Sequence, residues 1–304
     1  MISYDSPPAR QRRPPRRRSP RWPLVVACVV VAVGLLAGYK FLSRPAPRPA
    51  PPAARGPLLS HAQALKLGAC IDPTLSIESS FAPSIRHDLA TGIGQLAPPA
   101  GPPRTDRRTR AQPAVSLLIR EVDTNSFSSQ PGQYAAQVTV SGVHGLTRRR
   151  PPPSASAGYT RALAIWSKDS QVVAADRKQA AGDAASAVRT VAALPLDRRK
   201  GSFSAITACV SALLVDVPAG GRRGYLVASD LEENEAPQLA GSFGGAPLLI
   251  VQTCESGDAG RCQQLLSHFK ALMHRLHAGR ITVVRPEDAG SAIAQWVRTG
   301  EVSP

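Results

Sequence analysis

The sequence lacks the short motifs that mark several common enzyme and binding classes. It has no G-x-S-x-G segment, the turn that exposes the serine of α/β-hydrolases, and no P-loop lysine motif for holding phosphates. No C-x-x-C pair is present, which argues against a structural zinc site. No DNA- or RNA-binding motif is visible either. These absences favour a binding function over catalysis.

Acidic residues are almost missing from the first part of the chain. Residues 1–58 contain eleven Lys and Arg residues but a single acid, Asp5, whereas the rest of the chain holds 26 basic and 20 acidic residues. The formal net charge of +16 therefore belongs mostly to the N-terminal segment. A nucleic-acid-binding domain needs a basic face on its folded part, so this distribution makes nucleic acid an unlikely partner.

Charge is absent altogether from Trp22 to Tyr39. Eighteen uncharged residues in a helix span roughly 27 Å, close to the hydrocarbon core of a bilayer, and the terminal aromatics suit its two interfaces. The run predicts a transmembrane helix over residues 22–42. A cleaved signal peptide would need a better cleavage site than Ala37-Gly38-Tyr39, and a buried helix would not be flanked by Pro and Arg.

The flanks of this run predict its orientation and the domain organisation. Residues 1–21, with seven arginines, are expected to form a disordered cytoplasmic tail, because the denser basic flank stays inside. Residues 43–58 form a Pro/Ala linker, and residues 59–304 one domain outside the cytoplasm. We therefore expect a single-pass protein of the cell membrane.

Apolar strand patterns alternate with helical patterns along this domain. This alternation predicts an α/β fold with a Rossmann-like, doubly wound and mostly parallel sheet, and a short connection adds one antiparallel edge strand. The expected strands are 67–71, 115–122, 134–143, 223–229, 248–253 and 280–284, and the expected helices are 77–96, 159–194, 204–215, 262–277 and 288–299.

Polar residues follow two of these strands. Asp72, Thr74 and Ser76 come two apart after the first, and Ser229-Asp230 ends a later one. Carboxylate and hydroxyl oxygens suit a hard divalent cation, and the carboxyl ends of parallel strands share one edge of a sheet. The segments resemble the metal-ion-dependent adhesion site of von Willebrand factor A-like domains.

The resemblance implies a ligand set and a mode of binding. Asp72 would lie near the cation with Thr74, Ser76 and Asp230, and a hydroxyl of Ser202 or Ser204 would join them where the family most often has Thr. The implied ion is Mg²⁺, or Mn²⁺ or Ca²⁺. An acidic group of a protein or cell-wall ligand would complete its shell, without catalysis.

Simpler roles stay open for these residues. Thr74 or Ser76 can cap the helix that follows, and Asp230 can cap a helix over Leu231–Gln238. The same fold can also serve as a metal-free scaffold in a membrane-associated complex. A hydrolase or phosphotransferase using Asp72 is more remote, because position 74 is Thr and not a second acid.

Four cysteines fall in the expected extracytoplasmic domain, where disulfides are permitted. Cys254 and Cys262 flank a short Gly-containing loop and are the candidate disulfide. Cys70 and Cys209 are either a second bridge or two buried thiols.

Overall fold

The computed structural model describes residues 59–73, 77, 79–99, 108–122, 135–196, 204–234, 236–254 and 258–303. All of them belong to one compact unit, Gly56–Pro304. The tail, the transmembrane helix expected at 22–42 and the linker at 43–58 lie outside the described residues. Among the residues that are described, no helix is both long and apolar enough to span a bilayer.

A six-stranded sheet forms the centre of the domain, in the order β4-β3-β2-β6-β7-β8. All neighbouring pairs are parallel except β3 and β4, so the antiparallel strand lies at an edge. The expected mixed α/β fold with a mostly parallel sheet is confirmed. The bounds are β2 Leu65–Ile71, β3 Val115–Glu121, β4 Ala136–Val140, β6 Arg222–Ser229, β7 Leu248–Gln252 and β8 Ile281–Val284.

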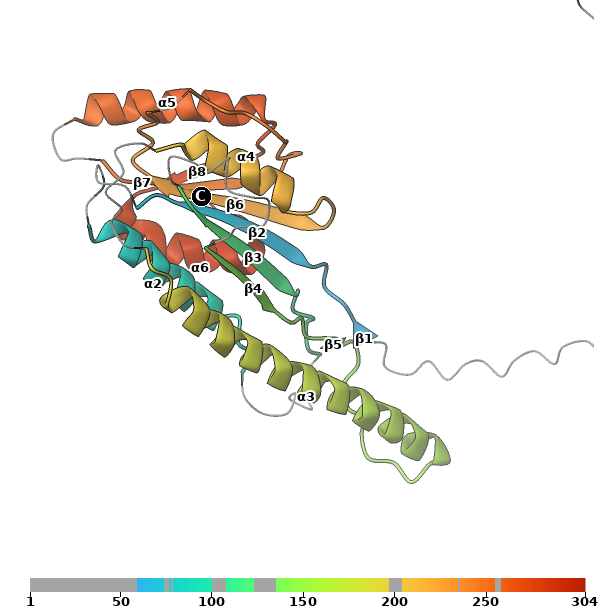
Figure 1. Ribbon diagram of the computed structural model, residues 1–304. Coiled ribbons are helices and arrows are strands. Elements are labelled where there is room, and N and C mark those ends of the chain that lie inside the picture. The colour runs from blue at the N-terminus through green and yellow to red at the C-terminus, as the bar shows by residue number, and fades with distance from the viewer. Residues whose placement is uncertain are drawn as a thin grey trace, which may run out of the picture. The chain divides into compact units, whose positions relative to one another are not determined.

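Helices cover both faces of this sheet, with α4 and α5 on one face and α2, α3 and α6 on the other (Figure 1). Alternate residues of a strand point to opposite faces. In β6, Leu226 and Ala228 accordingly enter one core, and Tyr225 and Val227 enter the other. The central strands are almost wholly apolar because both of their faces are buried. The helices are α2 Phe81–Gly94, α3 Ala157–Ala192, α4 Ile206–Asp216, α5 Ala259–Arg275 and α6 Ala289–Thr299.

The longest helix, α3, is continuous over 36 residues, and Gly182 does not interrupt it. Its N-terminal turns extend past the six-stranded sheet (Figure 1). Two aspartates dock it against the chain that follows β4. Asp183 accepts hydrogen bonds from the backbone N–H (3.1 Å) and hydroxyl (2.5 Å) of Ser141. Asp176 accepts from the backbone N–H of His144 (3.2 Å) and lies 2.5 Å from its Nδ1.

A small second sheet, which the sequence did not lead us to expect, pairs β1 (Leu59–Ser60) with β5 (Gly145–Leu146) in antiparallel register. It lies beside α3, and Leu59 and Leu146 both pack with the core on that face of the main sheet. The chain therefore enters the domain next to the segment that leads into α3.

The helix expected over Leu231–Gln238 is wrong. Its described residues form a non-helical loop, in which Leu231 has a φ of 64°. The loop is held along α4 by side chains: the Ser211 hydroxyl donates to the carbonyl of Gln238 at 2.7 Å, and Thr207 accepts from the Gln238 N–H at 3.0 Å. Side chains of α4 therefore form the hydrogen bonds with backbone groups of this loop that a local helix would otherwise form.

Two disulfides connect elements of the domain. Cys70 of β2 is bonded to Cys209 of α4, with both residues fully buried and their Cα atoms 6.2 Å apart. Cys254, after β7, is bonded to Cys262 in the first turn of α5, with a Cα separation of 6.1 Å. Both separations fall in the normal range for the bond.

Candidate functional site

The carboxyl ends of β2 and β6 form the centre of the candidate site. These strands are parallel neighbours, with Ile71 beside Ala228, and the N–H of Asp72 continues the ladder by donating to the Ala228 carbonyl at 2.9 Å. From β2 the chain first adds β3 and β4 outward on one side, and then returns to add β6, β7 and β8 on the other side. This is the point where the strand order reverses, and sheets of this kind place their ligand crevices there.

Asp72 is a fully buried carboxylate surrounded by hydroxyl donors. The Ser229 hydroxyl donates to its Oδ2 at 2.8 Å, and the Ser204 hydroxyl lies 3.4 Å from its Oδ1. Ser204 and Ser229 are themselves buried. A buried carboxylate is costly unless polar partners compensate for lost hydration, so these hydroxyls stabilise its position.

Asp230 is the second acid of the site and is only partly buried. Its Oδ1 lies 3.4 Å from the Ser229 Oγ and accepts the N–H of Glu232 at 2.9 Å. The Ser229 Oγ also accepts the N–H of Leu231 at 2.9 Å. One hydroxyl therefore lies between the two carboxylates, and Asp230 forms the solvent-facing side of the pair.

The loop after Asp230 is fixed to the start of α4. Glu233 accepts hydrogen bonds from the backbone N–H (3.0 Å) and the hydroxyl of Thr207, in the first turn of α4. The carbonyl of Ser204 accepts the N–H of Asn234 at 3.3 Å. Glu232 forms an ion pair with Arg261 of α5. The segment that carries Asp230 is thus bonded to both helices on this face of the sheet.

The structure brings together three of the six residues predicted for a metal site, Asp72, Ser204 and Asp230. Thr74, Ser76 and Ser202 lie outside the described residues. The cap alternative for Ser76 and Thr74 is wrong, because α2 begins only at Phe81, with Ser80 at its N-cap position. Ser229 was part of the motif at the end of this strand but was not predicted as a ligand, and Glu233 was not predicted to belong to the site.

The described donors offer only oxygen: two carboxylates and two serine hydroxyls. Within the described ranges no group of three or more His, Cys, Asp and Glu residues is placed to share a metal ion. An all-oxygen set with few carboxylates is a poor match for zinc or copper, and it suits a hard cation that keeps several water ligands, as Mg²⁺ does. By donor type alone, the described oxygens are compatible with the hard cation that the resemblance implies.

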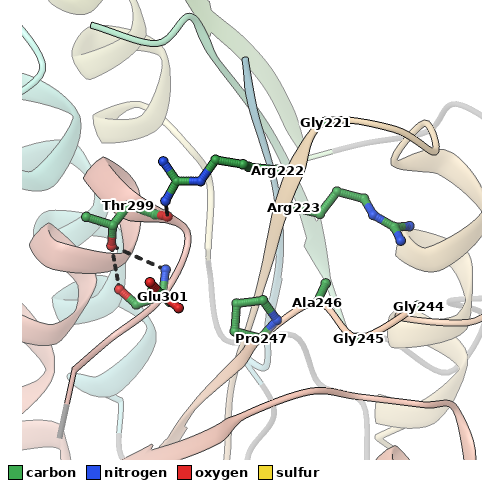
Figure 2. Close-up of a pocket in the computed structure, with 9 residues that line it drawn as sticks. All are labelled: Gly221, Arg222, Arg223, Gly244, Gly245, Ala246, Pro247, Thr299 and Glu301. Carbon is green, nitrogen blue, oxygen red and sulfur yellow. Dashed lines mark hydrogen bonds between the residues drawn. The ribbon is translucent and has the colours of Figure 1, made fainter. Parts of the chain in front are cut away.

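A separate pocket of about 300 Å³ lies at the amino ends of the parallel strands, where β6 and β7 begin (Figure 2). Arg222 and Arg223 extend to opposite sides of β6, and Gly244 and Gly245 line the wall. Arg222 donates to the carbonyl of Thr299, and Arg223 donates to that of Phe243 at 2.9 Å. Each guanidinium is hydrogen-bonded to a backbone carbonyl, and the two groups do not point toward a common position. We therefore interpret this pocket as a place where chain segments pack together, and not as a ligand site.

No protein-family model matches the chain, and no match to it is found among curated proteins.

Proposed function

We propose that the chain is a membrane-anchored binding module similar to von Willebrand factor A-like domains, which recognises its ligand through a divalent cation. The observation that supports this proposal most is that Asp72 and Asp230 both approach the Ser229 hydroxyl, while Ser204 approaches Asp72, at the point where the strand order reverses. These residues are distant in sequence, and the resemblance to the adhesion site requires them to lie close together.

In this proposal the cation is Mg²⁺, with Mn²⁺ or Ca²⁺ as substitutes, and it lies on the Asp230 side of the pair, because Asp72 is fully buried. Thr74, Ser76 and Ser202 belong to the proposed ligand set as well. An acidic group of a protein or cell-wall ligand completes the coordination shell. The site binds and does not catalyse, since a buried Asp72 carboxylate is poorly placed to attack a phosphate or an ester.

The proposed location is the outer side of the cell membrane, with residues 22–42 as the single anchor. Two disulfides within the domain support this location, because such bonds persist in oxidising compartments. The absence of charge in the anchor segment and the arginine-rich tail before it supply the orientation.

Titration of Mn²⁺ into residues 56–304, followed by the six-line electron paramagnetic resonance spectrum of the free ion, tests this proposal. Both hydrophobic cores lie within this unit. The intact domain should remove one equivalent of free ion, and excess Mg²⁺ should release it. Asp230→Asn should abolish this binding while keeping the wild-type circular dichroism spectrum, and Asp258→Asn, an exposed N-cap variant on α5, should retain it.

A metal-free scaffold of the same fold is the second candidate, and one observation favours it. The hydroxyls of Ser204 and Ser229 already serve the buried carboxylate of Asp72. On this reading no Mn²⁺ is bound, and Ser229→Ala lowers stability without any change in ion binding. The titration above therefore decides between the two functions.

A further inference from the structure

Seven exposed basic side chains gather at one end of the domain. They come from the segment before β3, the segment after β5, and the first turns of α3, and they are Arg108, Arg110, Arg148, Arg149, Arg150, Arg161 and Lys168. No acidic residue occurs anywhere between residues 136 and 168. This basic end, with these seven basic residues, therefore has a high density of positive charge, and the nearest acidic residue that follows in the sequence is Asp169.

Backbone contacts hold these segments together. Thr109, which lies between two of the arginines, donates its N–H to the Leu146 carbonyl at 3.1 Å, and its hydroxyl accepts the Leu146 N–H at 2.8 Å. The Arg150 guanidinium lies over the Trp166 ring of α3, 6.0 Å from the ring centroid. The segments before β3 and after β5 are thus held to each other and to α3, which keeps their basic residues at this end of the domain.

The chain enters the domain at the same end. β1 (Leu59–Ser60) pairs with Gly145 and Leu146, directly before the Arg148–Arg150 run. Residues 43–58 precede this strand, and a Pro-rich linker of this length spans at most about 50 Å. A domain tethered by such a linker keeps its point of attachment, and with it the basic end, within reach of the bilayer.

We propose that this basic end docks on anionic phospholipid headgroups of the membrane that anchors the chain. This inference rests on the proposed membrane anchor and does not depend on the cation site. Lipid is favoured over a soluble partner because the charge lies where the tether attaches. A basic side chain near an anionic bilayer strengthens binding by about fivefold, so several together give measurable association that weakens with salt.

Co-sedimentation of residues 56–304 with lipid vesicles in EDTA tests the proposal without the anchor and without the cation. The domain should bind phosphatidylcholine vesicles containing 30% phosphatidylglycerol, release them in 0.5 M NaCl, and ignore pure phosphatidylcholine. Neutralising Arg108, Arg110 and Arg149 to Gln should weaken binding on the order of a hundredfold. These three side chains are exposed, so the variant should keep its fold.

A matched variant removes the same charge elsewhere: Arg189→Gln, Arg275→Gln and Arg285→Gln, at exposed positions outside the basic end. It should bind vesicles within a few-fold of wild type. Equal losses in the two variants, or equal binding to neutral vesicles, would overturn the proposal. So would capture of soluble polyphosphate through Arg108, Arg110 and Arg149 without vesicle binding. Carbonate extraction of membranes carrying the full chain tests the anchor separately, and Mn²⁺ titration tests the cation site.

Discussion

The bridge between Cys70 and Cys209 should contribute more to stability than any other single bond in the described domain. It joins residues 139 positions apart, whereas Cys254 and Cys262 are only 8 apart. A crosslink stabilises mainly by reducing the conformational freedom of the unfolded chain, and the reduction grows with the length of the closed loop. The two bridges of this domain therefore provide an internal comparison of a long and a short loop.

The chain-entropy relation gives the size of the two effects. Closing a loop of this length at Cys70–Cys209 contributes about 5 kcal/mol to the free energy of unfolding, and closing the short loop contributes about 2.6 kcal/mol. Cys70 and Cys209 are also fully buried, so replacing both by Ala leaves space in the core and adds to the loss. Since small domains are stable by about 5–15 kcal/mol, loss of the long bridge should bring the domain close to unfolding at 25 °C.

Urea unfolding of two double variants measures the difference. Cys70→Ala/Cys209→Ala should lose at least about 2 kcal/mol more than Cys254→Ala/Cys262→Ala. Native-state reduction with dithiothreitol, followed by alkylation and mass spectrometry, gives an independent readout: exposed Cys254 should be labelled first, and the buried pair only after unfolding. If the two variants lose equal stability, or if the buried pair is labelled first, the reasoning is refuted.

For four further substitutions the structure predicts the direction of the change in stability. Gly182→Ala, at an open position within α3, should raise the free energy of unfolding by about 0.5–1 kcal/mol, because alanine costs less backbone entropy in a helix. Gly224→Ala should lower it by about 1–3 kcal/mol, because the new Cβ would collide with the backbone at the C-terminal cap of α6; urea midpoints measure both, and a stable Gly224 variant would contradict the packing. The hydrogen bond from the Ser141 hydroxyl lowers the pKa of Asp183, so its contribution to stability is present above the unfolded carboxyl pKa and is lost as the pH falls through the lower folded pKa. Stability of Asp183→Asn should therefore fall less steeply than wild type below about pH 4, and parallel acid limbs would exclude this role. Partial burial raises the pKa of Asp88, against an opposing effect of His87, so its charged form disfavours folding at neutral pH; Asp88→Asn should be more stable than wild type at pH 7, and that gain should shrink as the pH falls through the raised pKa.

The sheet and the place of its two acids could be predicted from the sequence because both depend on local patterns. Short apolar runs such as residues 248–251 favour strands buried on both faces, and residues that directly follow parallel strands share one edge of the sheet. This rule placed Asp72 and Asp230 at the same edge, and the alternation of helices and strands predicted the mostly parallel sheet. The hydrogen bonds of Ser229 could not be predicted from the sequence, because they depend on how close its hydroxyl lies to the carboxylates of Asp72 and Asp230.

Long-range contacts account for what the sequence could not show. Asp-Leu-Glu-Glu after β6 has the composition of a helix start, yet Thr207 and Ser211 of α4 hold this segment in an extended loop. The alternatives for Cys70 and Cys209 could not be separated either, because the pairing depends on where α4 crosses β2. Likewise, nothing near His144 in sequence points to Asp176, 32 residues away on α3.

The bonds around the candidate site form a closed frame, and this bears on how the proposed site would bind. β2, which carries Asp72, is linked covalently to α4 through Cys70–Cys209, and α4 is bonded through Thr207 to Glu233 in the loop that carries Asp230. That loop is paired through Glu232 to α5, which is joined to the end of β7 by the second disulfide. The described part of the site is held by these bonds and should lose little conformational entropy on binding, so a few oxygen ligands can suffice for useful affinity. The frame also leaves the partly exposed Asp230 as the side from which an ion, and then an acidic group of a partner, can approach.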